Sequence, residues 1–134
     1  MGQWMRSHGL LPDHVVSSPA TRARQTCKRV CHELGVDSAG IHRDERLYLA
    51  SLYDLLAVIA DCPASTASML LVGHNPGLES LLRHLAGASV PKPADGKLMP
   101  SAALAVLDIR KDWQHLQGGS ACRVELVRPR ELPI

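Results

Sequence analysis

The stretch MLLVGHNPGLESLL (69–82) decides the fold class of this 134-residue chain. Its first four residues are continuously apolar, which is typical of a strand buried on both faces of a parallel sheet. His74 lies in the turn that follows, and Asn75 and Pro76 predict the start of a helix. Leucines at helical spacing continue that helix: Leu78, Leu81, Leu82 and Leu85. A strand followed directly by a helix indicates an α/β unit.

A second junction of the same kind lies upstream, in HVVSSPATRARQT (14–26). Residues 14–18 predict a short buried strand. Ser18 as N-cap, with Pro19 at the first helical position, then predicts a helix that ends at Gly35. Arg22 lies in the first turn of that predicted helix.

The remaining elements complete one α/β domain over residues 1–134. Ser51 and Asp54 have the spacing of a capping box, and the helix behind them is expected to end near Pro63. Residues 89–101 are rich in Pro and Gly and predict a loop. Residues 103–109 and 122–127 predict two further strands. Strands that alternate with helices favour a mostly parallel sheet.

Composition excludes several classes of function. Hydrophobic residues make up 46% of the chain and the net charge is +2, which indicates a globular protein without the basic excess of a nucleic-acid binder. No apolar run has the length of a membrane-spanning helix, and the N-terminus lacks a secretory apolar region. We therefore expect a cytoplasmic protein with reduced cysteines, in which Cys27 and Cys31 are buried side chains rather than metal ligands. We expect no metal and no cofactor.

Arg22 and His74 occupy equivalent positions at the two junctions. Ligands of α/β sheets bind beyond the carboxyl ends of strands, where helix N-termini favour anions. Each residue alone is more often a solvated helix residue or a satisfied polar group in a turn. Together they predict an anion or phosphate site. Arg24, in the same turn, is a secondary candidate whose usual role is a solvent-facing cation. Asn75 either orients the His74 turn or serves as a helix N-cap, the more common role.

The stretches SSPATRARQT (17–26), DERLYLAS (44–51) and LLVGHNPGLESLLRHLAG (70–87) resemble the histidine phosphatase superfamily, and within it the SixA-like phosphohistidine phosphatases. The resemblance implies a three-layer αβα phosphoglycerate-mutase-like fold. It also implies a metal-independent hydrolase that acts through a phosphohistidine intermediate. The implied partner is a protein phosphorylated on histidine, such as a His-phosphotransfer domain, or a small phosphoester.

The resemblance assigns roles to three residues. Arg22 matches the phosphate-binding arginine, and His74 matches the second active-site histidine. Glu45 lies where larger relatives keep a general acid, although an exposed carboxylate in a charged run is usually only solvated.

The chain departs from the family pattern at the nucleophile. The family places it in an Arg-His-Gly motif after an apolar first strand, and no such motif occurs here. RSHG (6–9) has the form of a helix end, with Gly9 as the stop, and cannot replace it. We therefore expect the N-terminal strand to be missing. We also expect a marginally stable chain that is weakly active or inactive and prone to pair with another chain. A gene start assigned too late and a true loss both remain open. The alternative function is a non-catalytic phosphate- or phosphoprotein-binding module.

The sequence also contains the residue spacing of a different class of phosphatase. Cys122 and Arg128 are separated by five residues, the spacing of the cysteine-phosphatase signature. The intervening RVELV alternates polar and apolar side chains as a strand does, and an extended segment would hold the two groups too far apart to share one phosphate. We interpret this spacing as a coincidence.

Overall fold

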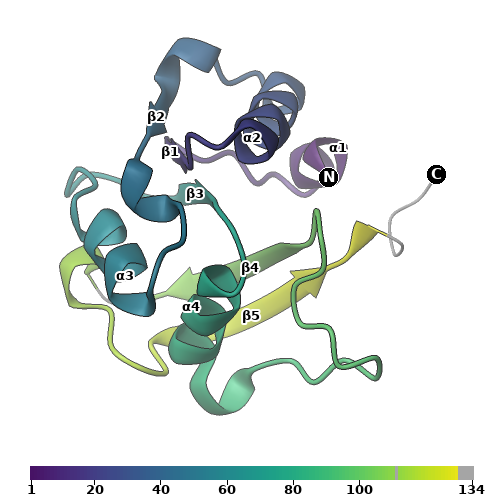
Figure 1. Ribbon diagram of the computed structural model, residues 1–134, viewed down its shortest axis with the longest axis vertical. Helices are drawn as coiled ribbons and strands as arrows, with labels where there is room; N and C mark the ends of the chain where they lie inside the picture. The colour runs from purple at the N-terminus through teal and green to yellow at the C-terminus, as the bar shows by residue number, and fades with distance from the viewer. Residues whose placement is uncertain (111, 130–134) are drawn as a thin grey trace.

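The computed structural model describes residues 1–110 and 112–129 (Figure 1). Helices and strands follow one another along the chain as α1 (Gly2–Ser7), β1 (His14–Ser17), α2 (Thr21–Leu34), β2 (Ile41–Arg43), α3 (Leu52–Ala60), β3 (Met69–Val72), α4 (Gly77–Ala86), β4 (Leu104–Ile109) and β5 (Ala121–Val127). A short 3₁₀ turn, Glu45–Leu47, follows β2.

The strands form two sheets. β2, β1 and β3 make a parallel sheet in that order, with Val15 level with both Ile41 and Leu70. β4 and β5 pair in antiparallel fashion as a separate two-stranded sheet, with an irregularity between Asp108 and Ile109. The expected mostly parallel sheet is thus confirmed for three strands, while the last two form their own antiparallel ribbon.

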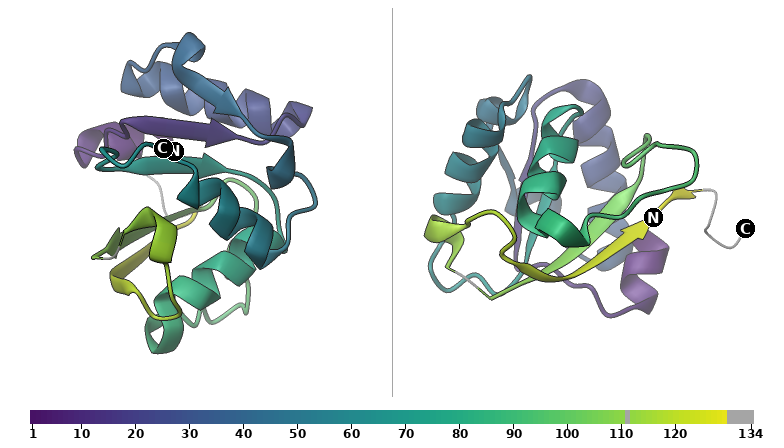
Figure 2. Two further views of the ribbon diagram at one scale, coloured as in Figure 1. Left: turned by 90° about the vertical axis from the view of Figure 1, so that its left-hand side faces the viewer. Right: turned by 90° about the horizontal axis from the view of Figure 1, so that it is seen from below.

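Helices cover both faces of the parallel sheet and give the predicted three layers (Figure 2). Val15 and Val16 are neighbours in β1, so their side chains point to opposite faces. Val15 packs with Met5 of α1 and with Cys27 and Cys31 of α2. Val16 packs on the other face, in the cluster that α3 and α4 cover with these buried side chains: Leu55, Val58, Ile59, Leu81 and Leu85.

β3 is less buried than its sequence predicts. Of its four residues only Leu70 is buried, and the others are half-buried. β3 pairs with β1 along one edge, and no other described strand pairs with its second edge. Among the described residues, β3 is therefore an edge strand of the three-stranded sheet. β1, which has partners on both edges, is buried over Val15–Ser17.

Helix starts were predicted with mixed success. The capping box is present, because the Ser51 hydroxyl accepts from Asp54 N–H at 3.2 Å and Asp54 Oδ2 accepts from Ser51 N–H at 2.9 Å. That helix ends at Ala60, a turn before the expected Pro63. The prediction for Ser18 was wrong, since α2 begins at Thr21 with Ala20 as its N-cap and without a capping side chain.

The RSHG stretch forms a helix end, as expected. α1 stops at Ser7, and Gly9 follows with φ +69°, a conformation that favours glycine. His8 stacks on Trp4 with ring centroids 4.0 Å apart, and its Nδ1 lies 2.8 Å from the Trp4 carbonyl oxygen. In the described part of the chain, no helix has both the length and the apolar character needed to span a bilayer.

Candidate functional site

Three parallel strands end at one edge of the sheet, and the candidate residues follow them. Ser18 N–H donates to the Val72 carbonyl at 2.9 Å, and Asp44 N–H donates to the Ser17 carbonyl at 3.0 Å. These bonds hold the chain segments after β1, β2 and β3 side by side. The two junctions singled out in the sequence therefore lie next to each other in space.

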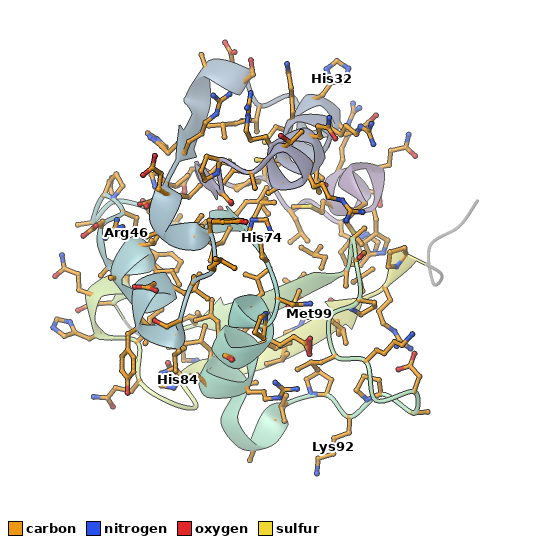
Figure 3. All side chains as sticks on the ribbon, viewed as in Figure 1. His32, Arg46, His74, His84, Lys92 and Met99 are labelled. Atoms are coloured by element: carbon orange, nitrogen blue, oxygen red, sulfur yellow. The ribbon has the colours of Figure 1, made fainter. Side chains whose placement is uncertain are left out.

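His74 lies in the turn between β3 and α4 and is half-buried (Figure 3). Its Nε2 is 2.8 Å from the hydroxyl of Ser18. The Tyr48 ring meets the imidazole edge-on, with centroids 5.6 Å apart and planes at 87°. These two contacts come from different segments and hold the ring in one orientation.

Ser18 is completely buried at the end of β1. Its oxygen accepts a hydrogen bond from Ala20 N–H at 3.3 Å, just before α2 begins. The serine that the sequence indicated as a helix cap is therefore the link between the two junctions.

Arg22 lies in the first turn of α2 and is exposed. No ion pair joins it to a carboxylate of the described residues, so its guanidinium is available to an anion. The free N–H groups and positive dipole end of the fourteen-residue helix lie beside it. Arg24 is also exposed, but residues two positions apart are about 200° apart around a helix. Arg24 therefore leaves α2 on another side.

An open cavity of about 580 Å³ is lined by Pro19, Ala20, Glu45 and Tyr48. Pro19 and Ala20 lie between Ser18 and Arg22, and Tyr48 is the residue that contacts His74. Glu45 is exposed in the 3₁₀ turn after β2. The structure thus brings the predicted acid to the same cavity mouth as the turn before α2.

Arg46, the other arginine after β2, is already engaged. Its guanidinium contacts Asp44 Oδ2 and Asp61 Oδ2, both at 2.7 Å. These hydrogen bonds raise the pKa of Arg46 and hold the pKa of Asp44 below its usual range. Two carboxylates neutralise this arginine, so it is a poor ligand for an added anion.

Asn75 is not the N-cap of α4, which was the more common of the two roles expected for it. Its side-chain amide donates to the Met99 carbonyl at 2.6 Å, while Pro76 precedes α4 as the N-cap without a side-chain bond. Asn75 therefore ties the loop of residues 90–103 to the turn that carries His74.

Gly77, the first residue of α4, leaves no room for a side chain, because an added Cβ would lie 2.8 Å from the Ala50 carbonyl oxygen.

The other groups of chemical interest do not form a centre. Cys122 is exposed on β5 and its thiol donates to the Asp108 carbonyl, while Arg128 pairs with Asp95 at 2.8 Å. Because β5 is extended between them, the predicted strand is confirmed. Within the described residues, no group of three or more His, Cys, Asp or Glu side chains is placed to hold a metal ion.

Sequence reasoning missed two contacts of this site. Tyr48 belongs to DERLYLAS, a stretch that the resemblance had already singled out, yet nothing in its spacing indicates a contact with His74. Ser18 was noticed for its position before Pro19, which indicates a turn or a cap but gives no sign of a partner 56 residues away.

Comparisons with known proteins match nearly the whole chain. An uncharacterized protein of Mycobacterium leprae (strain TN) is 30% identical over 132 residues, 96% of this chain and 79% of that protein. An uncharacterized protein of Mycobacterium tuberculosis (strain CDC 1551 / Oshkosh) is 31% identical over 133 residues, 96% of this chain and 81% of that protein. No family model matches the sequence.

Two solved structures share the fold. The proposed phosphohistidine phosphatase SixA from Nakamurella multipartitia has a TM-score of 0.69 at 28% identity, over 92% of this chain and 76% of that one. The proposed SixA from Agrobacterium tumefaciens has a TM-score of 0.75 at 26% identity, over 96% and 75% respectively. The α/β architecture with a parallel sheet is therefore that of the phosphoglycerate-mutase-like, SixA-type structures.

Proposed function

We propose a phosphatase-type function for this chain, which belongs to the same protein family as the mycobacterial proteins above and has the fold of the SixA structures. The proposed ligand is a phosphoryl group at the carboxyl ends of β1 and β3. One observation carries the proposal: His74 is held by the buried Ser18 beside an open cavity, next to the helix start that bears the unpaired Arg22.

Each residue of the site has a chemical role in this proposal. Arg22 offers a planar fork of N–H groups to the phosphate oxygens, and the first turn of α2 adds main-chain donors. His74 donates to a third oxygen and stabilises the charge that develops during transfer. Glu45 is the proposed proton donor to the leaving group. Metal is not required where these cationic and N–H groups neutralise the phosphate.

The nucleophile is the part of the reaction that these residues do not supply. Residues 1–134 contain no Arg-His-Gly motif, and His8 lies on α1 with its ring stacked on Trp4. We propose that this 134-residue polypeptide binds phosphate but turns over phosphoesters weakly or not at all by itself. The second candidate, a non-catalytic phosphoprotein-binding module, is favoured by this same placement of His8.

The surface around the cavity supports a protein as the phosphorylated partner. Tyr48, which lines the cavity, is 55% exposed, and Leu49, the next residue in the chain, is 82% exposed. Exposed apolar side chains gathered beside a site indicate a contact surface. A phosphohistidine on a small protein is therefore the proposed substrate, ahead of a small phosphoester.

The first test is calorimetric titration of the 134-residue chain with inorganic phosphate. Arg22→Ala should weaken binding about tenfold or more, because a charge-assisted hydrogen bond contributes roughly 1.5–3 kcal/mol. The matched control is Arg29→Ala, which removes an exposed arginine seven residues further along the same helix. An Arg22→Ala variant that binds as tightly as the control would contradict the proposed site.

A second experiment distinguishes an enzyme from a non-catalytic binding module. The chain is incubated with a His-phosphotransfer domain carrying radiolabelled phosphohistidine, and label retained on its histidines is measured together with released phosphate. We expect binding of the phosphorylated domain without trapped label. Trapping on a histidine with release of phosphate would show that the nucleophile lies within these residues.

A further inference from the structure

We propose that Ser18 is a positioning residue that fixes the tautomer of His74, so that Nδ1–H is the donor left for a bound anion. The identity of that anion rests on the function proposed above. The tautomer itself follows from the contacts of a single buried hydroxyl.

The direction of the hydrogen bond between Ser18 and His74 follows from the other bond that the serine makes. A serine hydroxyl has one proton and two lone pairs. Ala20 N–H occupies one lone pair at 3.3 Å, which leaves the proton in need of an acceptor. Ser18 is 0% exposed, so water cannot serve, and a buried hydroxyl without an acceptor is costly. His74 Nε2, at 2.8 Å, accepts that proton.

The protonation of the imidazole then follows. A neutral imidazole carries one proton, and the nitrogen that accepts a hydrogen bond is the one that lacks it. Because Nε2 accepts from Ser18, Nδ1 carries the proton. No other described group hydrogen-bonds to Nδ1. In this tautomer His74 can therefore donate its Nδ1–H to a phosphate oxygen.

The main chain holds Ser18 where this bond requires it. Ser18 N–H donates to the Val72 carbonyl at 2.9 Å, two residues before His74. This bond fixes the main chain of Ser18 against β3, which leads into the turn that carries His74, and the small serine side chain leaves the ring little freedom to turn.

The experiment records ¹⁵N shifts of the His74 ring, in the full 134-residue chain without ligand, at an alkaline pH where imidazole is neutral. We expect the shifts of the Nδ1–H tautomer. Ser18→Ala should move them toward Nε2–H, and Ser18→Thr, which keeps the hydroxyl, should restore them. Ser18→Ala should also weaken binding of inorganic phosphate about fivefold, the net worth of one hydrogen bond.

Ser17→Ala is the matched control. Ser17 is as buried as Ser18, at 1%, but its hydroxyl bonds to the main chain and not to His74. This variant should keep the tautomer and the phosphate affinity of the unmodified chain. If Ser18→Ala does not fold, the spectrum of the unmodified chain still decides, because an Nε2–H tautomer there would overturn the proposal.

The two readouts separate this inference from the proposed function. An Nδ1–H tautomer in a chain that does not bind phosphate would uphold the role of Ser18 and contradict the phosphate site. Phosphate binding by a chain with the Nε2–H tautomer would uphold the phosphate site and contradict the role of Ser18. An unchanged tautomer in a folded Ser18→Ala variant would overturn the inference directly.

Discussion

Cys27 and Cys31 of α2 show how burial sets the chemistry of a side chain. Their sulfur atoms lie 4.0 Å apart, and each residue is 1% exposed. Burial, with the neighbouring Cys31 as a second cause, raises the pKa of the Cys27 thiol to about 12. The thiolate is the reactive form, so a raised pKa suppresses it at neutral pH.

We predict that alkylation with iodoacetamide separates the cysteines by exposure. In the folded chain Cys122, which is exposed, should be labelled first, while Cys27 and Cys31 stay unlabelled. Peptide mass spectrometry over a time course measures this order. In urea all cysteines should react alike, which provides the control. Labelling of Cys27 as fast as Cys122 in the native chain would contradict the burial argument.

The same scale shows where prediction of the site from sequence stops. The places of Arg22 and His74 follow from local patterns, since each stands next to the end of an apolar strand. The bond between Ser18 and His74 joins residues 56 positions apart. A serine before a proline is equally suited to cap a helix, and only the pairing of β1 with β3 decides which partner it meets. Tyr48 depends in the same way on how the chain turns after β2.

Among the elements, α3 is the one whose start the sequence predicts in full. The capping box of Ser51 and Asp54 lies within four residues, so no distant partner is needed. Ser51→Ala should lower the free energy of unfolding by about 1 kcal/mol, within the roughly 0.5–2 kcal/mol range of lost N-caps. Urea denaturation at neutral pH measures this. Ser65→Ala, in an exposed loop, is the control and should leave the midpoint unchanged.

This capping box also makes the stability of the folded chain depend on pH. The hydrogen bond from Ser51 N–H lowers the pKa of Asp54 from its usual 3.8, so the folded chain favours the carboxylate. The resulting stabilisation is present above pH 3.8 and is lost as the pH falls through the lower folded pKa. The gap in stability between the unmodified chain and Asp54→Asn should therefore narrow on acidification. If the difference in unfolding free energy between the two proteins stays constant across this pH window, the Asp54 carboxylate does not stabilise the helix start in this way.

At the scale of the whole molecule, the layers were predictable and the division of the sheet was not. Helical and strand periodicities are local patterns, and they correctly predict which faces of α2 and α3 are buried. The continuous apolar run of β3 predicted burial on both faces. Burial also depends on which strands lie at the two edges, and the pattern of one strand contains no information on that. Among the described strands, β3 pairs only with β1, and β4 pairs only with β5.

β3 and β4 nevertheless share their surroundings. Leu71 of β3 and Leu107 of β4 pack against the cluster under α3 and α4. Val72 of β3 and Leu104 of β4 pack against the cluster under α1 and α2. Two strands that contact the same layers on both faces, without hydrogen bonds between them, present open edges with half-buried apolar side chains. Such edges favour pairing with another chain.

We therefore predict that the 134-residue chain self-associates through these edges as its concentration rises. The Val72 carbonyl accepts from β1, so by alternation the main-chain groups of Met69 and Leu71 face the open edge. Sedimentation should show a concentration-dependent dimer. Amide exchange at Met69 and Leu71 should slow with dimerisation, whereas Leu70 and Val72, whose main-chain groups face β1, provide the internal control and should change little. A chain that stays monomeric at high concentration would contradict this prediction, as would a dimer whose Met69 and Leu71 amides exchange as fast as in the monomer.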